Sequence, residues 1–312
     1  MAETNSLLNC RTRLVYHEFE SRPLRQSSRR RQQCRRFVLY ILQTTTHLYC
    51  PPDKLNHVAI FSYLRRKTSE TMFAVFKKEL AVFFSSVMGY LAILIFLIAT
   101  GLFLWVIPGG NNVLDGGYAT LDGLFGLAPW LFLFLIPAIT MRSFAEERKT
   151  GTLDLLQTRP LTETQLVLGK NLASLAIALI AISPTLIYFL SVYVLGNPAG
   201  NIDTGGTWGS YIGLVLLAMV YVSIGCFCSS LTDSQVVAFL LAIVITFVFY
   251  MGFDVAGDAF GGIGQIMSAL SIDEHYRSIS RGVADTRDLV YFVCTAAFFV
   301  LLTQYKLKLD KK

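Results

Sequence analysis

Residues 143–171 read SFAEERKTGTLDLLQTRPLTETQLVLGKN and form the only long charged segment with helical patterning between two strongly apolar runs. Ser143 and Glu146 have the spacing of a capping box, and so do Thr162 and Gln165. In a capping box, two side chains satisfy backbone N–H groups that the first turn of a helix leaves free. The spacing therefore predicts two helix starts within this one segment.

Gly151 and Pro160 divide the segment. Glycine adopts the left-handed conformation readily, and a proline pushes the residue before it out of the helical region. We therefore expect a short separate helix over residues 152–158. Its apolar face is formed by Leu153 and Leu156, with Leu155 beside them. Such an element can lie along a membrane surface and present a firm edge to a soluble partner.

The whole chain is too apolar for an ordinary soluble domain. Its 312 residues are 54% hydrophobic and 15% charged, whereas soluble proteins carry about 25% charged residues. The positive charge is concentrated in residues 1–71, which hold 13 Lys and Arg against 5 Asp and Glu, a net +8. Residues 72–312 hold 14 against 16, a net −2. The basic character of the protein therefore belongs to its first part alone.

Six apolar runs follow Met72. The first, residues 87–107, is long enough to cross roughly 30 Å of hydrocarbon as a helix that rises about 1.5 Å per residue. The stretch FAVFKKELAVFF, residues 73–84, precedes the first run and predicts an amphipathic helix at the membrane interface. These patterns predict an all-α, polytopic membrane protein with six transmembrane helices. The predicted spans are about 87–107, 124–140, 172–195, 211–230, 236–255 and 289–305.

Basic residues set the predicted orientation, because short cytoplasmic loops carry an excess of Lys and Arg. Loops 108–123 and 196–210 contain none, whereas the segment 143–171 and the C-terminal tail contain several. Both termini and the segment 143–171 are therefore predicted to be cytoplasmic. The loop 256–288 is then external although it contains three arginines. Nearby acids balance these charges, and we expect the loop to fold as short helices at the outer surface.

Residues 1–71 do not continue the membrane pattern. They include an arginine cluster, RQSSRRRQQCRRF at residues 25–37, of a kind that can contact nucleic acid or anionic lipid. Two other interpretations stand: a disordered basic extension, or a stretch upstream of the true start, because Met72 opens the interfacial helix. We favour these two and assign no nucleic-acid partner.

The motif E-E-R-K-x-G-T-L-D-L-L-x-T-R-P-L-x-x-x-Q-x-x-x-G-K stands at residues 146–170. It resembles the cytoplasmic coupling segment of ABC-2-type transporter permeases. Together with HYRSISRGVADTRDLVYF at residues 275–292, it resembles more closely the gliding-motility-associated permeases of the GldF type, found in Bacteroidetes. The resemblance covers residues 72–312. It implies a permease domain there, and a multi-pass subunit of an ATP-driven exporter linked to gliding motility in the bacterial inner membrane.

The resemblance also implies partners. A separate ABC ATPase subunit would bind ATP and magnesium, and a second permease, an auxiliary gliding subunit or a second copy of this chain would complete the transporter in the lipid membrane. Charged residues of the segment would make polar contacts with the ATPase, and its leucines would fill a groove there or pack on the inner leaflet. A merely solvated charged face is the simpler alternative. The predicted coupling residues are Glu146, Glu147, Arg148, Gly151, Thr152, Leu153, Leu155, Leu156 and Pro160.

A second set of residues is predicted to shape the backbone: Pro184, Arg281, Gly282, Arg287 and Asp288. The proline should kink the third span, because it removes one helical hydrogen bond whose loss Ser183 or Thr185 can relieve. Within residues 281–288, the glycine allows a turn, and the arginines can pair with local acids. Asp285 or Thr286 can cap the helix of the last span.

No combination of residues in the sequence points to catalysis. The phosphate-loop pattern GxxxxGK[ST] does not occur, since Gly169-Lys170 is followed by Asn171. His275 lies beside two acids, but three neighbouring residues rarely converge on one metal ion. We therefore predict no catalytic, cofactor or metal site in this chain. The alternative functions are an ion-coupled secondary transporter, for which only Asp254 and Pro184 offer a basis, and a structural membrane subunit of a motility or secretion complex.

Overall fold

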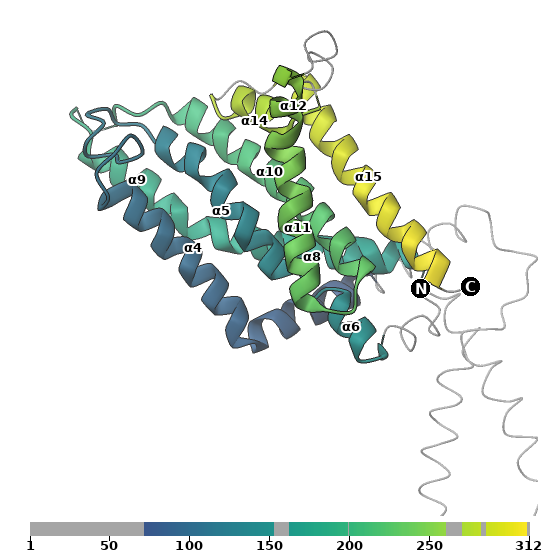
Figure 1. Ribbon diagram of the computed structural model, residues 1–312. Coiled ribbons are helices and arrows are strands. Elements are labelled where there is room, and N and C mark those ends of the chain that lie inside the picture. The colour runs from purple at the N-terminus through teal and green to yellow at the C-terminus, as the bar shows by residue number, and fades with distance from the viewer. Residues whose placement is uncertain (1–71, 153–161, 199, 260–269, 282–284, 311–312) are drawn as a thin grey trace, which may run out of the picture. The chain divides into compact units, whose positions relative to one another are not determined.

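The computed structural model describes residues 72–152, 162–198, 200–259, 270–281 and 285–310, and every regular element in these ranges is helical (Figure 1). The predictions for residues 1–71 therefore lie outside the described part of the chain. The same holds for the predictions made for Leu153, Leu155, Leu156, Pro160 and Gly282.

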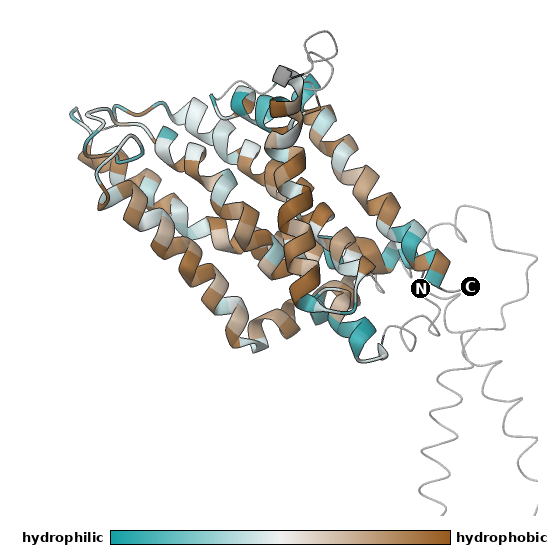
Figure 2. Cartoon of the chain, viewed as in Figure 1, coloured by the Kyte–Doolittle hydropathy of each residue, from teal (hydrophilic) through white to brown (hydrophobic). Residues whose placement is uncertain are grey.

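Six helices in the described ranges are long and apolar enough to cross a membrane. The predicted all-α, six-span architecture is thus confirmed, whereas the orientation stays a prediction. Apolar residues run along these helices, and polar residues gather at their ends (Figure 2). The spans are formed by α4 (Val87–Trp105), α5 (Asp122–Thr140), α8 (Glu163–Ile182) with α9 (Leu186–Leu195), α10 (Thr204–Leu231), α11 (Gln235–Phe247) and α15 (Thr286–Asp310).

The helix α10 is the centre of the bundle and packs against α5, α11 and α15. Its residues Leu217, Ala218 and Tyr221 are fully buried. A β-carbon on Gly225 of α10 would lie 2.1 Å from the Thr140 hydroxyl of α5, so the close approach of these two helices requires the absence of a side chain there. The apolar faces that α4, α9 and α11 leave exposed are instead suited to contact lipid or other chains.

Several helices extend beyond the apolar runs that predicted them. The helix α8 begins at Glu163 rather than near residue 172, and α10 begins at Thr204 rather than near residue 211. Polar caps explain the difference. Thr162 and Gln165 form the predicted capping box at the start of α8, and Asp203 accepts a hydrogen bond from the Gly206 N–H (3.0 Å) at the start of α10.

The third span is interrupted at the proline. Residues Ser183–Thr185 form a 3₁₀ turn, η2, between α8 and α9. A proline at position 184 has no N–H for the Ile180 carbonyl. The Ser183 hydroxyl donates a hydrogen bond to that carbonyl instead (2.9 Å). The turn therefore keeps its backbone acceptor satisfied at membrane depth, where no water is present to do so.

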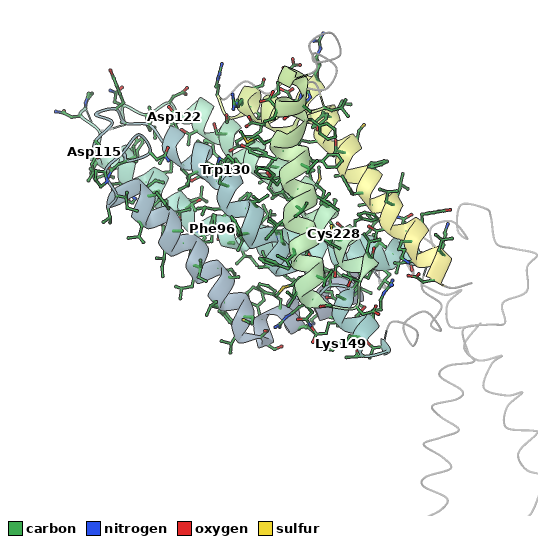
Figure 3. All side chains as sticks on the ribbon, in the orientation of Figure 1. Phe96, Asp115, Asp122, Trp130, Lys149 and Cys228 are labelled. Carbon is green, nitrogen blue, oxygen red and sulfur yellow. The ribbon has the colours of Figure 1, made fainter. Side chains whose placement is uncertain are left out.

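The end of the bundle opposite α6 carries short helices. The helix α11 passes through a π-helical turn, η3 (Val248–Gly252), into α12 (Phe253–Ala259), and α14 (Ile272–Ile279) follows. Within the predicted external loop 256–288, α14 matches the expected short helix. The Tyr276 hydroxyl of α14 donates to the Phe125 carbonyl of α5 (2.9 Å), and burial raises the pKa of this phenol well above its usual range, so it stays a neutral donor. Asp115 and Asp122 lie at this end, far from Lys149 (Figure 3).

Candidate functional site

The helical corner between α5 and α8 is the candidate coupling site. The helix α6 (Ala145–Lys149) stands there. The predicted capping box of Ser143 and Glu146 is wrong, because α6 begins after Phe144 and no side chain of its own caps it. The Ser229 hydroxyl of α10 accepts from the backbone N–H groups of Phe144 (3.0 Å) and Ala145 (3.1 Å) instead. The backbone just before α6 forms a turn and is not extended. The hydroxyl of Ser229, far away in sequence, therefore caps the helix.

The end of α6 is closed by glycine, as the sequence predicts. Gly151 has φ +69°, in the left-handed region, and its N–H donates to the Arg148 carbonyl (3.1 Å). The Thr150 hydroxyl donates to the Glu146 carbonyl (2.9 Å). The helix therefore stops after little more than one turn, and Thr152 follows on the exposed surface.

A buried lysine lies at the centre of the corner. The Lys170 side chain is 1% exposed, and its Nζ lies 2.8 Å from Glu79 Oε1 and 2.9 Å from Glu147 Oε2. Lys78 Nζ lies 2.6 Å from the other oxygen of Glu147. Lys170 also donates to the Ser143 carbonyl. We call these four charged residues, Lys78, Glu79, Glu147 and Lys170, the Lys170 cluster.

The Lys170 cluster is electrically neutral, with two lysines and two glutamates. Neutrality matters because an isolated charge is costly to bury, whereas a paired and hydrogen-bonded one is tolerated. The cluster joins three parts of the chain that are far apart in sequence: the helix at residues 72–85, α6 and α8. These three elements therefore form one tightly held unit at the end of the bundle.

Gly169 allows this arrangement. A β-carbon at this position would lie 3.1 Å from Val75 Cγ1 and 3.2 Å from the Met72 carbonyl. The helix at residues 72–85 thus packs directly on the backbone of α8. In the sequence Gly169 and Lys170 are the last two positions of the motif. In the structure, Gly169 allows the helix at residues 72–85 to approach α8 closely, and Lys170 forms the ion pairs.

The predicted coupling residues divide into two groups. Glu147 is 8% exposed and belongs to the Lys170 cluster, and Arg148 forms ion pairs with Asp310 of α15 and with Asp233 (3.5 Å). Both therefore brace α6 against other parts of this chain. Glu146, Gly151 and Thr152 are exposed. Whether any of these residues contacts an ATPase stays a prediction.

The predicted backbone-shaping residues at the other end are not all paired as expected. The Asp288 carboxylate oxygen Oδ1 lies 2.7 Å from His275 Nδ1, and Arg277 pairs with Asp273 (2.7 Å). Within the described residues, Arg281 and Arg287 form no ion pair. Asp285 accepts from the Arg287 N–H (3.2 Å), as expected for the cap of α15. No group of three His, Cys, Asp or Glu side chains in the described part of the chain could hold a metal ion.

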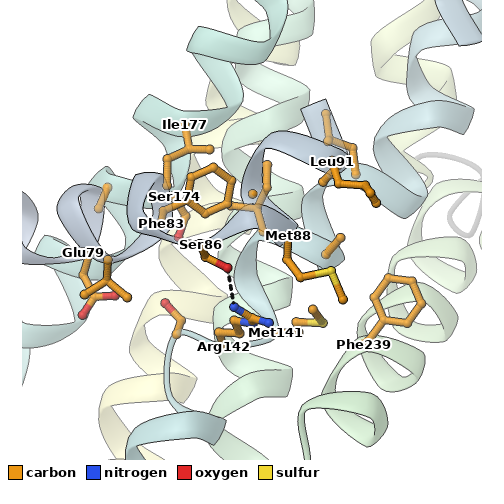
Figure 4. Close-up of a pocket in the computed structure, with 18 of the residues that line it drawn as sticks. Glu79, Phe83, Ser86, Met88, Leu91, Met141, Arg142, Ser174, Ile177 and Phe239 are labelled. Atoms are coloured by element: carbon orange, nitrogen blue, oxygen red, sulfur yellow. Dashed lines mark hydrogen bonds between the residues drawn. The ribbon is translucent and has the colours of Figure 1, made fainter. Parts of the chain in front are cut away.

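A cavity of about 620 Å³ lies beside the Lys170 cluster, between α4, α5, α8 and α11. Its walls are mainly apolar, and its charged lining residues are Lys78, Glu79, Arg142, Glu146 and Glu147. Figure 4 shows the hydrogen bond from Arg142 Nη1 to the Ser86 hydroxyl (2.8 Å) in its wall. This cavity could not be predicted from the sequence, because its lining comes from six helices: the helix at residues 72–85, α4, α5, α6, α8 and α11.

Six apolar helices with a charged, internally braced corner define a polytopic membrane protein. A comparison with protein families matches residues 38–303 to the family described as ABC-2 family transporter protein. The chain belongs to this family. It is therefore a membrane permease subunit of an ABC transporter, a type of subunit that is not itself catalytic and that associates with an ABC ATPase subunit. The match begins upstream of Met72. No curated protein matches the chain.

Proposed function

We propose that a separate ABC ATPase, which binds ATP and magnesium, docks on residues 143–171 and drives transport through this permease. The proposal takes this end of the bundle to face the cytoplasm and assigns no cofactor to the chain itself. The observation that carries it is the bracing of α6: a five-residue helix is too short to be stable alone, yet this one is held by α8, α10 and α15. Bracing of this kind suits an element that transmits force.

The proposed docking surface consists of exposed side chains of the segment that do not brace α6 within the chain. Glu147 and Arg148 are engaged within the chain, so among the described residues of the segment the exposed Glu146 and Thr152 are available to a partner. We propose that Leu153, Leu155 and Leu156, which the sequence places next, complete this surface. In this proposal the partner contacts the exposed side of α6 that carries Glu146, and Glu147 on the same helix conveys its movement to the Lys170 cluster.

We further propose that the transporter is an exporter linked to gliding motility in a bacterial inner membrane. The support is the resemblance of residues 143–171 and 275–292 to the GldF type of permease. A second permease, an auxiliary gliding subunit or a second copy of this chain would complete the assembly. The apolar faces of α4, α9 and α11 offer surface for such a partner as well as for lipid.

Co-purification with the ATPase tests the docking site. Leu156→Pro should abolish ATPase association while the chain still inserts into the membrane, because proline breaks the short helix that the sequence predicts there. Glu146→Arg should weaken association at an exposed position without disturbing the Lys170 cluster. The matched control is Glu274→Arg, an exposed glutamate on α14, which should leave association unchanged.

Two results would count against the proposal. Leu156→Pro and Glu146→Arg could both co-purify with the ATPase as the unmodified chain does. Alternatively, a cysteine placed at Thr150 could react with a membrane-impermeant label applied from outside the cell, which would put α6 on the wrong side of the membrane.

A further inference from the structure

The cavity beside the Lys170 cluster combines a mainly apolar lining with a few charged and polar side chains. Figure 4 shows Met88, Leu91 and Phe239 on one side of Arg142 and Ser86, and Glu79, Phe83, Ser174 and Ile177 on the other. All of these residues line the cavity. Its volume of about 620 Å³ falls within the range of roughly 300–1,000 Å³ that is usual for small-molecule sites. An occupant with one charged end and one long apolar end would match both kinds of lining.

Arg142 is the charge that this cavity leaves uncompensated. Its guanidinium donates to the Ser86 hydroxyl, its Nε is enclosed without a hydrogen-bond partner, and within the described residues no carboxylate lies in ion-pair distance of it. A guanidinium carries five N–H donors in a planar fork that matches phosphate or carboxylate oxygens. Most of this donor capacity is therefore unfilled.

The other charged residues that line the cavity are already paired or are exposed to water. Glu79 pairs with Lys170, and Glu147 pairs with both Lys170 and Lys78. Glu146 also lines the cavity but is exposed, so water screens its charge. An anion that entered the cavity would consequently meet one partly enclosed cation, Arg142, with a hydroxyl donor beside it.

We propose that this cavity binds a phospholipid, with the phosphate against Arg142 and Ser86 and an acyl chain along Met88, Leu91 and Phe239. The phosphate would accept hydrogen bonds from the free guanidinium N–H groups, and the chain would cover apolar surface that α4 and α11 expose. Arginine is suited to this role because its fork binds phosphate in a bidentate manner, whereas lysine acts as a point charge. The proposal does not depend on docking of an ATPase.

Equilibrium binding to the purified full-length chain tests the proposal. The probes are a phosphatidic acid with one fluorescent acyl chain and the diacylglycerol that carries the same chain but no phosphate. The unmodified protein should bind the phosphatidic acid at least about tenfold more tightly, a difference of about 1.4 kcal/mol, because only the phosphate can accept charge-assisted hydrogen bonds from Arg142. This comparison needs no variant, so a folding defect cannot affect it.

Variants then locate the site. Arg142→Gln should weaken phosphatidic acid binding by about tenfold or more and leave diacylglycerol binding unchanged, with Arg142→Lys in between. Ala138→Trp, which fills the cavity, should weaken both. Arg277→Gln is the matched control, because Arg277 lies on α14 in a different pocket, and it should change neither.

Three outcomes would overturn the proposal. The unmodified chain could bind the two probes equally, or Arg142→Gln could retain full preference for the phosphatidic acid. Ala138→Trp could also change the oligomeric state while lipid binding stays the same, which would show that a second copy of the chain covers this face.

Discussion

Replacing Lys170 with methionine is the sharpest test of the Lys170 cluster. Methionine keeps most of the length of the side chain and removes its charge. Glu79 and Glu147 would then face each other with one lysine, Lys78, to compensate both. Removing one partner of a buried ion pair costs about 3–5 kcal/mol. Because Lys78 already lies 3.9 Å from Glu79 and can move, we expect the lower end, a loss of ~3 kcal/mol.

A second substitution should partly reverse this loss. In the double variant Lys170→Met with Glu79→Gln, the remaining charges are those of Lys78 and Glu147, which already pair at 2.6 Å. The cluster is then neutral again. The double variant should therefore be more stable than Lys170→Met alone by about 1–2 kcal/mol, since residues in one ionic network couple by about 0.5–3 kcal/mol.

Thermal unfolding in detergent micelles measures both effects. A loss of ~3 kcal/mol corresponds to a fall in Tm of about 6–12 °C at about 2–4 °C per kcal/mol for a domain of this size. Lys149→Met is the control, because Lys149 is exposed and forms no ion pair with the described residues; the Tm of this variant should hardly change. Equal losses for the two lysines, or strictly additive losses in the double variant, would refute the reasoning.

Two further substitutions test how α6 and the interfacial helix are held. Gly169→Leu should push the helix at residues 72–85 off α8, costing about 1–3 kcal/mol through overpacking, and an unchanged rate of tryptic cleavage in that helix would contradict this. Ser229→Ala should cost about 1–3 kcal/mol, because it removes the acceptor of two backbone N–H groups at the start of α6. Ser223→Ala, whose hydroxyl bonds only within its own helix, should lower the Tm less; equal shifts would argue against the capping role.

The elements that the sequence predicts correctly depend on local rules. An apolar run of sufficient length must become a helix in a membrane, because only internal hydrogen bonds can satisfy its backbone there. The capping box at Thr162 and the left-handed Gly151 likewise involve residues within one turn of each other. The spacing of neighbouring residues in the sequence is enough to identify such features.

The features that the sequence does not predict arise from contacts between distant residues. The Ser143 capping box fails because Ser229, from another helix, already binds the two N–H groups at the bend. Lys170 could have been noticed as a cation at the edge of an apolar run, but its partners lie 91 and 23 residues away along the chain. Arg142 is similar, since the cavity beside it forms only when six helices pack together.

The contacts that hold α6 also determine where a force on it would go. Since α6 is joined to α8 through Lys170 and to the helix at residues 72–85 through Lys78, it cannot shift alone without separating buried charges. A displacement would therefore carry the start of α8 with it. That helix is continuous up to the 3₁₀ turn Ser183–Thr185, where the proline lacks an N–H and a serine hydroxyl has replaced the regular backbone bond. Bending costs least at such a break, so a movement of α6 would be passed through the ion pairs to the middle of the third span.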